Sequence, residues 1–400
     1  MKSHPFATCS LPAIIIAVIC IQNCAIAQQQ GSANDQQQPP SQSDTPSPVS
    51  AESPIPTPSE ILSAAPAAPA DRPEVLLIVG ASGTDEYGSN FKTWAERWQA
   101  AATAAAASFT WIGPGSPSTT SIAPSPTAEN TPATATQTPA QPTDLELIKS
   151  ALRTASSVTT SQPLWIIYIG HGTFDQKTAA LNLRGPDLTD AEFAELLKPT
   201  SRPLITAVCA SCSAPFINAL SAPGRIIISA TKDGNQLQYS RFGDAFSQAI
   251  GNLDADGDRD GQTSLLEAWL FASRRTAEFY KTEGRLASEH SLLEDNGDSR
   301  GVRSELFEGV RPGKNVTADQ PIDGSLAGKT WLIRSAEERL LTPDQQVTRD
   351  ALEARLEALK SRRSEIDEAD YLQQLEEILL PLAELYKAAE QQAATSPPAP

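Results

Sequence analysis

The sequence predicts an α/β fold in which helices cover both faces of a mostly parallel sheet, a three-layer α/β/α sandwich. Three short runs are apolar on both sides and therefore indicate fully buried strands: residues 75–79, 164–169 and 203–208. Between the last two runs, Thr189 and Glu192 form a capping-box pattern that opens a short helix over residues 193–197. A strand, a helix and a strand in this order form a parallel crossover unit, so both strands should end at one edge of the sheet.

The alternation of strands and helices continues through residues 73–335, which we expect to form this domain. Two more buried strands are expected at residues 109–112 and 225–230. Helices are expected at residues 91–106, 145–152, 213–220, 242–250 and 265–280. Residues 114–142 are rich in Pro, Thr, Ser and Ala, and we expect them to be a low-complexity insertion in a loop of the domain.

The start of the chain has the pattern of a signal peptide over residues 1–27. Lys2 supplies the positive charge, residues 11–19 the apolar core, and Ala25-Ile26-Ala27 a cleavage site. The apolar core is too short to span a membrane, and no later stretch reaches the roughly 18 apolar residues that a span requires. We therefore expect an exported protein, periplasmic or extracellular, without a membrane span.

Two segments outside the domain lack the large apolar residues that a core requires. Residues 28–72 are rich in Pro, Ser and Gln, and residues 393–400 are rich in Pro, so both are expected to be disordered. Residues 336–392 contain two charged, leucine-lined helices, at 343–360 and 368–390. They form either a helical hairpin packed on itself or a coiled coil through which chains self-associate.

Composition excludes several classes of function. The formal net charge of −17 argues against binding to nucleic acid, which requires basic patches. Three of the 5 cysteines and one of the 3 histidines fall in the signal peptide. The residues that remain are Cys209, Cys212, His171 and His290. Two cysteines form neither a disulfide framework nor a cysteine-based zinc site, and we expect no organic cofactor.

Reactive side chains follow the two central strands. His171-Gly172 follows the first, and the segment from Cys209 to Cys212 follows the second. A thiol becomes a strong nucleophile as the thiolate, which a nearby imidazole can generate. The backbone N–H of Gly172, together with that of the nucleophile, could stabilise the oxyanion of a tetrahedral intermediate.

These residues resemble the caspase clan of cysteine peptidases, and within it the legumain-like branch. His171-Gly172 matches the clan's His-Gly, and the segment from Ala210 to Ala214 resembles the legumain pattern Ala-Cys-x-Ser-Gly. Residues 229–240 resemble the strand and specificity-pocket loop of the family. The resemblance covers residues 74–251 without the insertion. It implies a caspase-like fold and hydrolysis of peptide bonds in a peptide or protein substrate.

The chain departs from this pattern at the nucleophile. When Ala210 and Ser213 are aligned with the family's Ala and Ser, the nucleophile column falls on Ser211, and Cys212 comes one place later. A shift of one residue at a strand end turns a side chain in another direction. Cys212 after such a shift, Ser211 and Cys209 therefore remain three candidates for the position, although Cys209 has the pattern of an inward strand residue.

Several functions follow from these candidates. The first is an exported cysteine endopeptidase with His171 as base and Cys212 as nucleophile. The second is a catalytically inactive caspase-like module that binds peptides or partner proteins. A Cys-x-x-Cys redox pair requires the motif at a helix N-terminus in a thioredoxin-like order, and the His-Gly strand upstream argues against it. A calcium-dependent envelope adhesion or assembly protein is a further alternative.

A second pattern, at residues 256–267, fits an EF-hand loop for structural calcium. The candidate ligands are Asp256, Asp258, Asp260, the backbone carbonyl of Gln262, Ser264 through water, and Glu267. Gly261 occupies the sharp turn at position six. Residues 295–301 form another acidic segment without this twelve-residue spacing, which we interpret as a turn, and His290 before it as a surface or loop histidine.

Overall fold

The computed structural model describes residues 72–117, 141–313, 322–363 and 365–395. The expected signal peptide, the linker up to residue 71, residues 118–140 of the insertion and the tail from residue 396 lie outside the described residues. The chain divides into two compact units, one spanning Asp71–Ser335 and one that includes Ala336–Pro400. Each unit is described by itself.

A six-stranded sheet forms the centre of the first unit, with the strand order β2-β1-β3-β7-β8-β9. The first five of these strands are parallel, and β9 pairs with β8 in the antiparallel direction. Their bounds are β1 Glu74–Val79, β2 Ser108–Ile112, β3 Leu164–Ile169, β7 Leu204–Cys209, β8 Arg225–Ser229 and β9 Leu292–Glu294.

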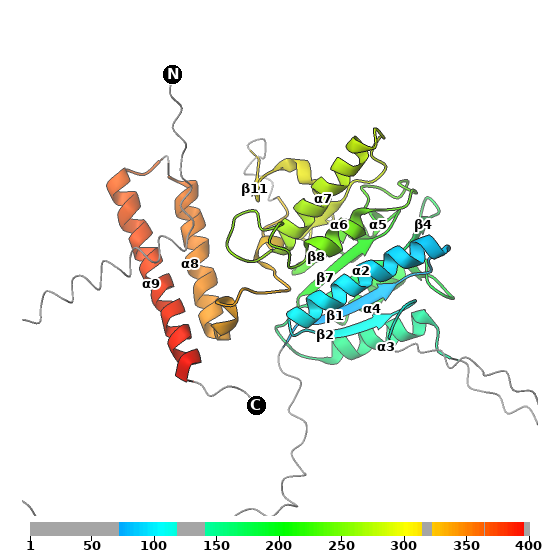
Figure 1. The fold of residues 1–400 in the computed structure, drawn as a ribbon, viewed down its shortest axis with the longest axis horizontal. Coiled ribbons are helices and arrows are strands. Elements are labelled where there is room, and N and C mark those ends of the chain that lie inside the picture. The colour runs from blue at the N-terminus through cyan, green and yellow to red at the C-terminus, as the bar shows by residue number, and fades with distance from the viewer. Residues whose placement is uncertain (1–71, 118–140, 314–321, 364, 396–400) are drawn as a thin grey trace, which may run out of the picture. The chain divides into compact units, whose positions relative to one another are not determined.

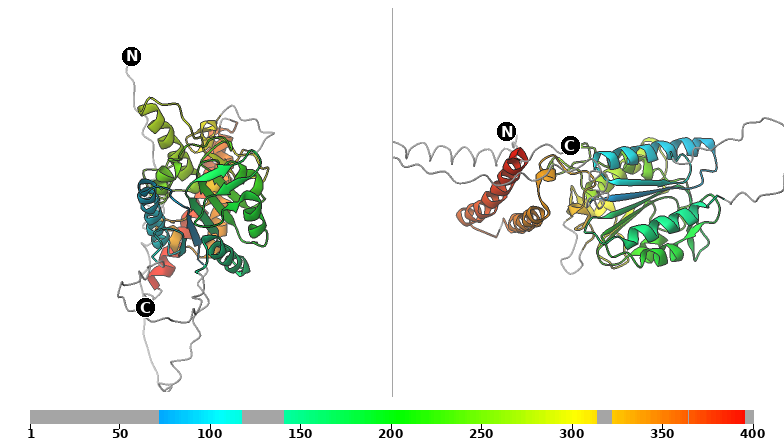
Figure 2. Two further views of the ribbon diagram at one scale, coloured as in Figure 1. Left: turned by 90° about the vertical axis from the view of Figure 1, so that its right-hand side faces the viewer. Right: turned by 90° about the horizontal axis from the view of Figure 1, so that it is seen from below.

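Helices lie on both faces of this sheet (Figures 1 and 2). Their bounds are α2 Asp85–Ala104, α3 Asp144–Ser157, α4 Asp190–Leu197, α5 Pro215–Leu220, α6 Phe242–Ala249 and α7 Leu265–Thr282. In β1, Val75 and Leu77 enter a core shared with α2, α6 and α7, whereas Leu76 enters the core shared with α3, α4 and α5. The alternation of side chains along each strand thus fills two apolar layers, and the predicted three-layer α/β/α fold is confirmed.

Helix boundaries follow the capping residues. The capping box predicted at Thr189 and Glu192 is present at the start of α4. The helix predicted from residue 91 begins six residues earlier, at Asp85, because the Thr84 side chain accepts a hydrogen bond from the amide of Tyr87. The first turn is polar and exposed, so the apolar periodicity that marked this helix does not include it.

The sequence pattern missed the short strands. A three-stranded antiparallel sheet follows β3, with the order β4-β5-β6. Its strands are β4 Gly172–Phe174, β5 Ala179–Leu181 and β6 Leu188–Thr189. A hairpin of β10 Phe307–Glu308 and β11 Arg311–Pro312 comes later, between the 3₁₀ turns η2 Ser304–Leu306 and η3 Ala327–Lys329. Strands of two or three residues are too short to show an alternating pattern.

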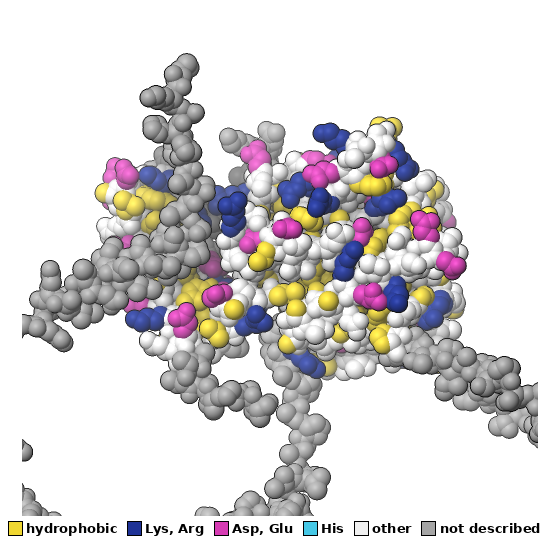
Figure 3. All heavy atoms as spheres, in the orientation of Figure 1, with side chains coloured by type: hydrophobic (Ala, Val, Ile, Leu, Met, Phe, Trp, Pro, Cys, Tyr) yellow, Lys and Arg dark blue, Asp and Glu magenta, His cyan; other side chains and the backbone are white. Residues whose placement is uncertain are grey.

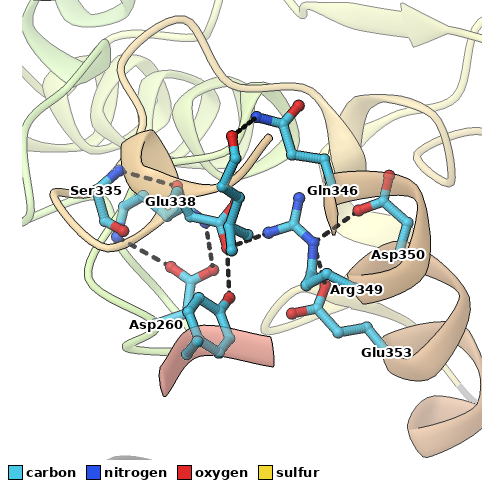
Figure 4. A network of polar contacts seen from close by, with 10 residues as sticks. Asp260, Ser335, Glu338, Gln346, Arg349, Asp350 and Glu353 are labelled. Carbon is cyan, nitrogen blue, oxygen red and sulfur yellow. Dashed lines mark hydrogen bonds and ion pairs between the residues drawn. The ribbon is translucent and has the colours of Figure 1, made fainter. Parts of the chain in front are cut away.

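The second unit contains η4 Glu338–Leu340 and the helices α8 Pro343–Ser361 and α9 Glu368–Thr395. α8 and α9 pack against each other through Leu352, Leu356, Leu359, Ile378, Leu379 and Leu382. The Arg349 side chain is buried and forms ion pairs with Glu338, Asp350 and Glu353 (Figure 4). Among the described helices, none combines the length and the apolar character that crossing a membrane requires.

On the face of the first unit drawn in Figure 3, Lys and Arg side chains are interspersed with Asp and Glu side chains.

Candidate active site

The candidate site forms where β3 and β7 end side by side. The two strands pair in parallel, with Ile169 opposite Cys209, so the segments that follow them lie at one edge of the sheet. β1 lies on the other side of β3, and the loop after β1 therefore reaches the same edge. Three loops meet here: residues 80–84, 170–172 and 210–214.

The His171 ring is oriented by two of these segments. Its Nε2 lies 3.1 Å from the carbonyl oxygen of Ser82. A carbonyl oxygen only accepts, so Nε2 carries a hydrogen and the neutral ring keeps a basic lone pair on Nδ1. The Tyr168 hydroxyl donates to the carbonyl oxygen of His171 at 2.7 Å and fixes the backbone. His171 is thus held in a tautomer that could act as a base.

Aromatic side chains surround this imidazole. The ring centroids of Tyr87 and Phe91 lie 5.0 and 5.3 Å from that of His171, and both rings meet it edge to face. Tyr239 stacks on Tyr87 at 4.5 Å and lies 6.1 Å from His171. Tyr87, His171 and Tyr239 are each partly exposed. The result is a half-exposed aromatic surface beside the two strand ends.

Ser211 occupies the position against Gly172. The Gly172 amide donates to Ser211 Oγ at 3.2 Å, and Ser211 Oγ donates to the Gly172 carbonyl oxygen at 3.1 Å. A Cβ on residue 172 would lie 2.3 Å from the Ser211 carbonyl oxygen, so only glycine permits this close approach. The amide that could serve as an oxyanion donor therefore points at a hydroxyl, and that hydroxyl is buried.

The Cys212 thiol has a different environment. Cys212 has a positive φ of 57°, its amide donates to the Gln236 carbonyl oxygen at 3.1 Å, and its Sγ lies 3.9 Å from the same oxygen. The side chain is 1% exposed. Burial raises the pKa of the thiol, the Ser211 hydroxyl lowers it, and the Asp233 charge raises it further. Such a thiol is poorly prepared to become a nucleophile.

Of the candidates for the nucleophile position, Ser211 lies against Gly172 and Cys212 lies against Gln236. The one-residue shift that the sequence would need does not occur, because Cys212 turns toward Gln236 and leaves Ser211 facing Gly172. Cys209 ends β7 within the core shared with α2, α6 and α7, and burial raises the pKa of its thiol. Both cysteines are free.

Two further contacts fix the loop that carries Ser211. The Ser213 hydroxyl accepts from the amides of Ala230 and Thr231, at 2.9 and 3.1 Å, at the end of β8. The Gln236 side chain donates to His290 Nδ1 at 2.8 Å, and burial lowers the pKa of that histidine. His290 therefore supports the loop that covers Cys212 and lies in a loop itself, as expected.

Several of these contacts had no signal in the sequence. Ser82 and Gln236 act through backbone carbonyl oxygens, which every residue carries. Tyr168 had the pattern of a core strand residue, although its hydroxyl fixes the backbone of His171. Gln236 and Tyr239 lie within residues 229–240, the segment that resembles the family's strand and specificity-pocket loop.

The expected calcium loop has the three aspartates together. One carboxylate oxygen from each of Asp256, Asp258 and Asp260 lies within 4.8 Å of the others. Gly261 has a φ of 88°, the left-handed backbone that the sharp turn at position six requires. Burial raises the pKa of Asp260 to about 7, and the neighbouring Asp258 charge adds to the effect. The concentrated negative charge suits a hard divalent cation.

The other candidate ligands of this loop lie differently. Glu267 is not part of the three-aspartate group: its Oε1 accepts from the amides of Gly257 and Asp258, and its Oε2 from Ser264. The Gln262 side chain is hydrogen bonded to the Ser335 amide, so only its backbone carbonyl remains a candidate ligand. The donor set fits calcium through the three aspartates, with Glu267 holding the backbone of the loop.

No protein-family model and no curated protein sequence matches the chain. Among solved structures, it is similar to caspase-1 from Spodoptera frugiperda, with 10% identity, a TM-score of 0.34, and coverage of 56% of this chain and 86% of that chain. It is also similar to the Drosophila initiator caspase Dronc, with 10% identity, a TM-score of 0.37, and coverage of 58% of this chain and 83% of that chain. A third similar structure is protein GSU0716 from Geobacter sulfurreducens, with 12% identity, a TM-score of 0.33, and coverage of 56% of this chain and 94% of that chain. Likenesses this distant do not assign an activity.

Proposed function

We propose that the chain is a catalytically inactive caspase-like module that binds extended peptide segments at the edge formed by His171 and Gly172. The contact between Ser211 Oγ and the Gly172 amide carries this proposal, because it fills the nucleophile position with a hydroxyl. A hydroxyl needs a base that takes its proton in order to attack a peptide bond. Ser211 instead donates its hydrogen to the Gly172 carbonyl oxygen.

Two features support peptide binding at this edge. β4 is an outer strand of its three-stranded sheet, so an extended peptide could pair with its main chain beyond Gly172, whose amide and carbonyl are bonded to Ser211. The partly exposed rings of Tyr87 and Tyr239 lie beside His171 and offer apolar contact area. Binding of this kind uses the strand ends without requiring a reactive thiol.

The competing function is an exported, legumain-like cysteine endopeptidase. One observation favours it: the tautomer of His171 is fixed by Ser82, as a general base requires. Cys212 would have to leave Gln236 and displace Ser211 before it could use that base. The two functions therefore differ in the reactivity of one thiol.

Alkylation of the unaltered, reduced chain tests this difference. We expect iodoacetamide to label Cys212 slowly at neutral pH, with a rate that increases only in the alkaline range, because its raised pKa keeps the thiol protonated. Peptide mapping identifies the labelled residue. We expect the His171→Ala variant to give the same rate. Rapid labelling below pH 7 that disappears in this variant would instead establish a histidine-activated thiolate and the peptidase.

The first acidic loop, residues 256–262, is proposed to hold calcium as a structural ion. The aspartates at positions one, three and five would bind it, and the ion would compensate charges that now raise the pKa of Asp260. We expect calcium at a hundred-fold excess over its dissociation constant to stabilise the folded chain by about 2.7 kcal/mol per site. The corresponding shift in melting temperature is roughly 5–10 °C.

Differential scanning calorimetry of the full chain measures this shift, and Asp258→Asn should reduce it. Asp175→Asn is the matched control, because Asp175 also accepts amide hydrogen bonds in an exposed turn but has no carboxylate partners there. An equal shift in all three proteins would exclude the first acidic loop as the binding site. Export through residues 1–27 and self-association through α8 and α9 are further proposals from the sequence pattern.

A further inference from the structure

The turn after β9 repeats the construction of the first acidic loop. We call residues 294–300 the second acidic loop. It begins at Glu294, the last residue of β9, and leads to Val302, which bridges back to Leu293. The acidic spacing counted from Asp295 does not show this similarity, because the residue equivalent to Asp256 at position one is Glu294, one residue earlier.

In the first acidic loop, each aspartate side chain accepts a hydrogen bond from the backbone amide of a residue two or three places later in the sequence. Asp256 at position one accepts from the amide at position four, at 2.6 Å. Asp258, at position three, accepts a hydrogen bond from the backbone amide at position five, at 3.2 Å. Asp260, at position five, accepts from the backbone amide at position seven, at 2.9 Å. Positions four and six, Arg259 and Gly261, have φ values of 64° and 88°.

The second acidic loop has the same contacts at the same positions. The Glu294 side chain, at position one, accepts a hydrogen bond from the amide at position four, at 2.6 Å. The Asn296 side chain, at position three, accepts from the amide at position five, at 2.8 Å, and the Asp298 side chain, at position five, accepts from the amide at position seven, at 2.7 Å. Gly297 and Ser299, at positions four and six, have φ values of 83° and 63°. Oxygen-bearing side chains thus alternate along both loops in one backbone conformation.

A further carboxylate holds the start of each loop. In the first loop, Glu267 accepts from the amides at positions two and three, at 2.8 and 3.2 Å. In the second loop, Asp323 accepts from the equivalent amides of Asp295 and Asn296, at 2.8 and 3.1 Å. Asp323 belongs to a different segment of the chain, which is why the twelve-residue spacing of an EF-hand is missing here.

The Glu294 carboxylate supplies the observation that points to a ligand. Its Oε1 accepts from the amides of Gly297 and Asp298, so the carboxylate head lies within the turn. Its Oε2 is buried and makes no hydrogen bond of ordinary geometry in the described part of the chain, the Ser221 hydroxyl is a side-chain donor near the carboxylate, and the residue is 0% exposed. A buried carboxylate oxygen without a donor is costly unless a cation compensates it.

The surroundings add negative charge and rigidity. Glu294, Asp295, Asp298 and Asp323 form no ion pair with Lys or Arg among the described residues. The Asp295 carboxylate accepts three amides of residues 324–327 and so keeps Asp323 beside the loop. A Cβ on Gly297 would lie 3.0 Å from the backbone nitrogen of residue 223, so the loop rests on the turn before β8.

We propose that the second acidic loop is a second divalent-cation site, with oxygen ligands suited to calcium. Its ligands are Glu294 through Oε2, the side chains of Asn296 and Asp298, the carbonyl of Arg300, and Asp323. A bound ion joins the edge strand β9 to the segment of Asp323 and stabilises the edge of the sheet. This site is independent of the function proposed for His171 and Ser211.

Equilibrium dialysis of the full chain against radioactive calcium, after treatment with a chelator, counts the sites. We expect about two ions per chain in the unaltered protein and about one in Asp298→Asn, because this exposed substitution removes one charged ligand of the second acidic loop. Asp258→Asn should also leave about one ion, and the double variant none. Asp175→Asn, which changes a carboxylate that accepts two amides in an exposed turn beside Lys177, should leave both ions bound.

The single variants separate the two loops. If Asp298→Asn binds as much calcium as the unaltered chain while Asp258→Asn loses an ion, the second site does not exist and only the first acidic loop binds. Binding of no calcium by the unaltered chain overturns both sites. Should Asp298→Asn be poorly folded, Asn296→Ala, which removes a partly exposed neutral ligand, is expected to weaken the same site at least five-fold.

Discussion

The Ser211→Cys variant is expected to gain a thiol that iodoacetamide labels at pH 7 roughly ten-fold or more faster than Cys212 in the unaltered chain. The new sulfur would replace an oxygen that already lies 3.2 Å from the Gly172 amide. A thiolate there is stabilised by this amide, next to the residue that carries the candidate base, His171. Mass spectrometry of the labelled peptides follows the rate across pH 5 to 9.

The pH profile identifies the cause of the reactivity. For Cys212, the raised pKa predicts that labelling increases only toward alkaline pH. For the new thiol, we expect labelling to persist below neutral pH and to be lost when His171→Ala is added. Equal, slow labelling of both thiols would show that Ser211 does not occupy a competent nucleophile position, and the caspase-like assignment of this site would fail with it.

The second large effect concerns stability. Arg202→Met is expected to lower the free energy of unfolding of the first unit by about 3 kcal/mol. The Arg202 side chain is 2% exposed and donates to the carbonyl oxygens of Gln162 and Pro163, at 2.8 and 3.2 Å. It also pairs with Glu74 at 2.8 Å, which joins the starts of β1, β3 and β7. Its removal takes the Arg202 donor from the Gln162 carbonyl oxygen and the Glu74 carboxylate at a buried sheet end, while the Pro163 carbonyl oxygen keeps the amide of Glu74.

Denaturant unfolding followed by tryptophan fluorescence measures the loss. Lys198→Met is the control, because the pair between Lys198 and Glu195 is exposed on both sides and should contribute within about 0.5 kcal/mol. Equal stabilities of Arg202→Met and Lys198→Met would mean that water replaces the buried donor, contrary to this account.

The long elements of the fold could be predicted because each has a strong local signal. Buried runs such as 164–169 are apolar on both sides, and Thr189 with Glu192 marks a helix start. β4, β5 and β6 could not be predicted, since their two or three residues are ordered by pairing with one another. The antiparallel direction of β9 likewise depends on its contact with β8.

The candidate site was predicted in its parts and not in its geometry. The sequence placed His171 and the segment 209–212 at one sheet edge, where the structure brings them together. The choice between Ser211 and Cys212 depends on one backbone torsion, the positive φ of Cys212, and on the carbonyl oxygen of Gln236. Neither contact leaves a mark in residue types, so residue types alone do not decide between Ser211 and Cys212.

The two acidic loops also differ in how much of each could be predicted from the sequence. The first loop has its candidate ligands in one stretch, so the spacing of an EF-hand loop finds them. The second loop takes Asp323 from a distant segment, so its similarity emerges only from hydrogen bonds to the amides of Asp295 and Asn296. The sequence pattern led to an interpretation as a simple turn, because four of the five proposed ligands lie in residues 294–300 and the fifth, Asp323, lies far along the chain.

The central claim is that this site binds peptides without cleaving them through a thiol. The most direct test is to incubate the full chain with a random peptide library and to analyse the bound and unbound peptides by mass spectrometry. We expect the unaltered chain to retain a subset of peptides intact and to produce no new termini. New termini that appear with the unaltered chain and vanish with Cys212→Ala would contradict the account and establish a cysteine peptidase.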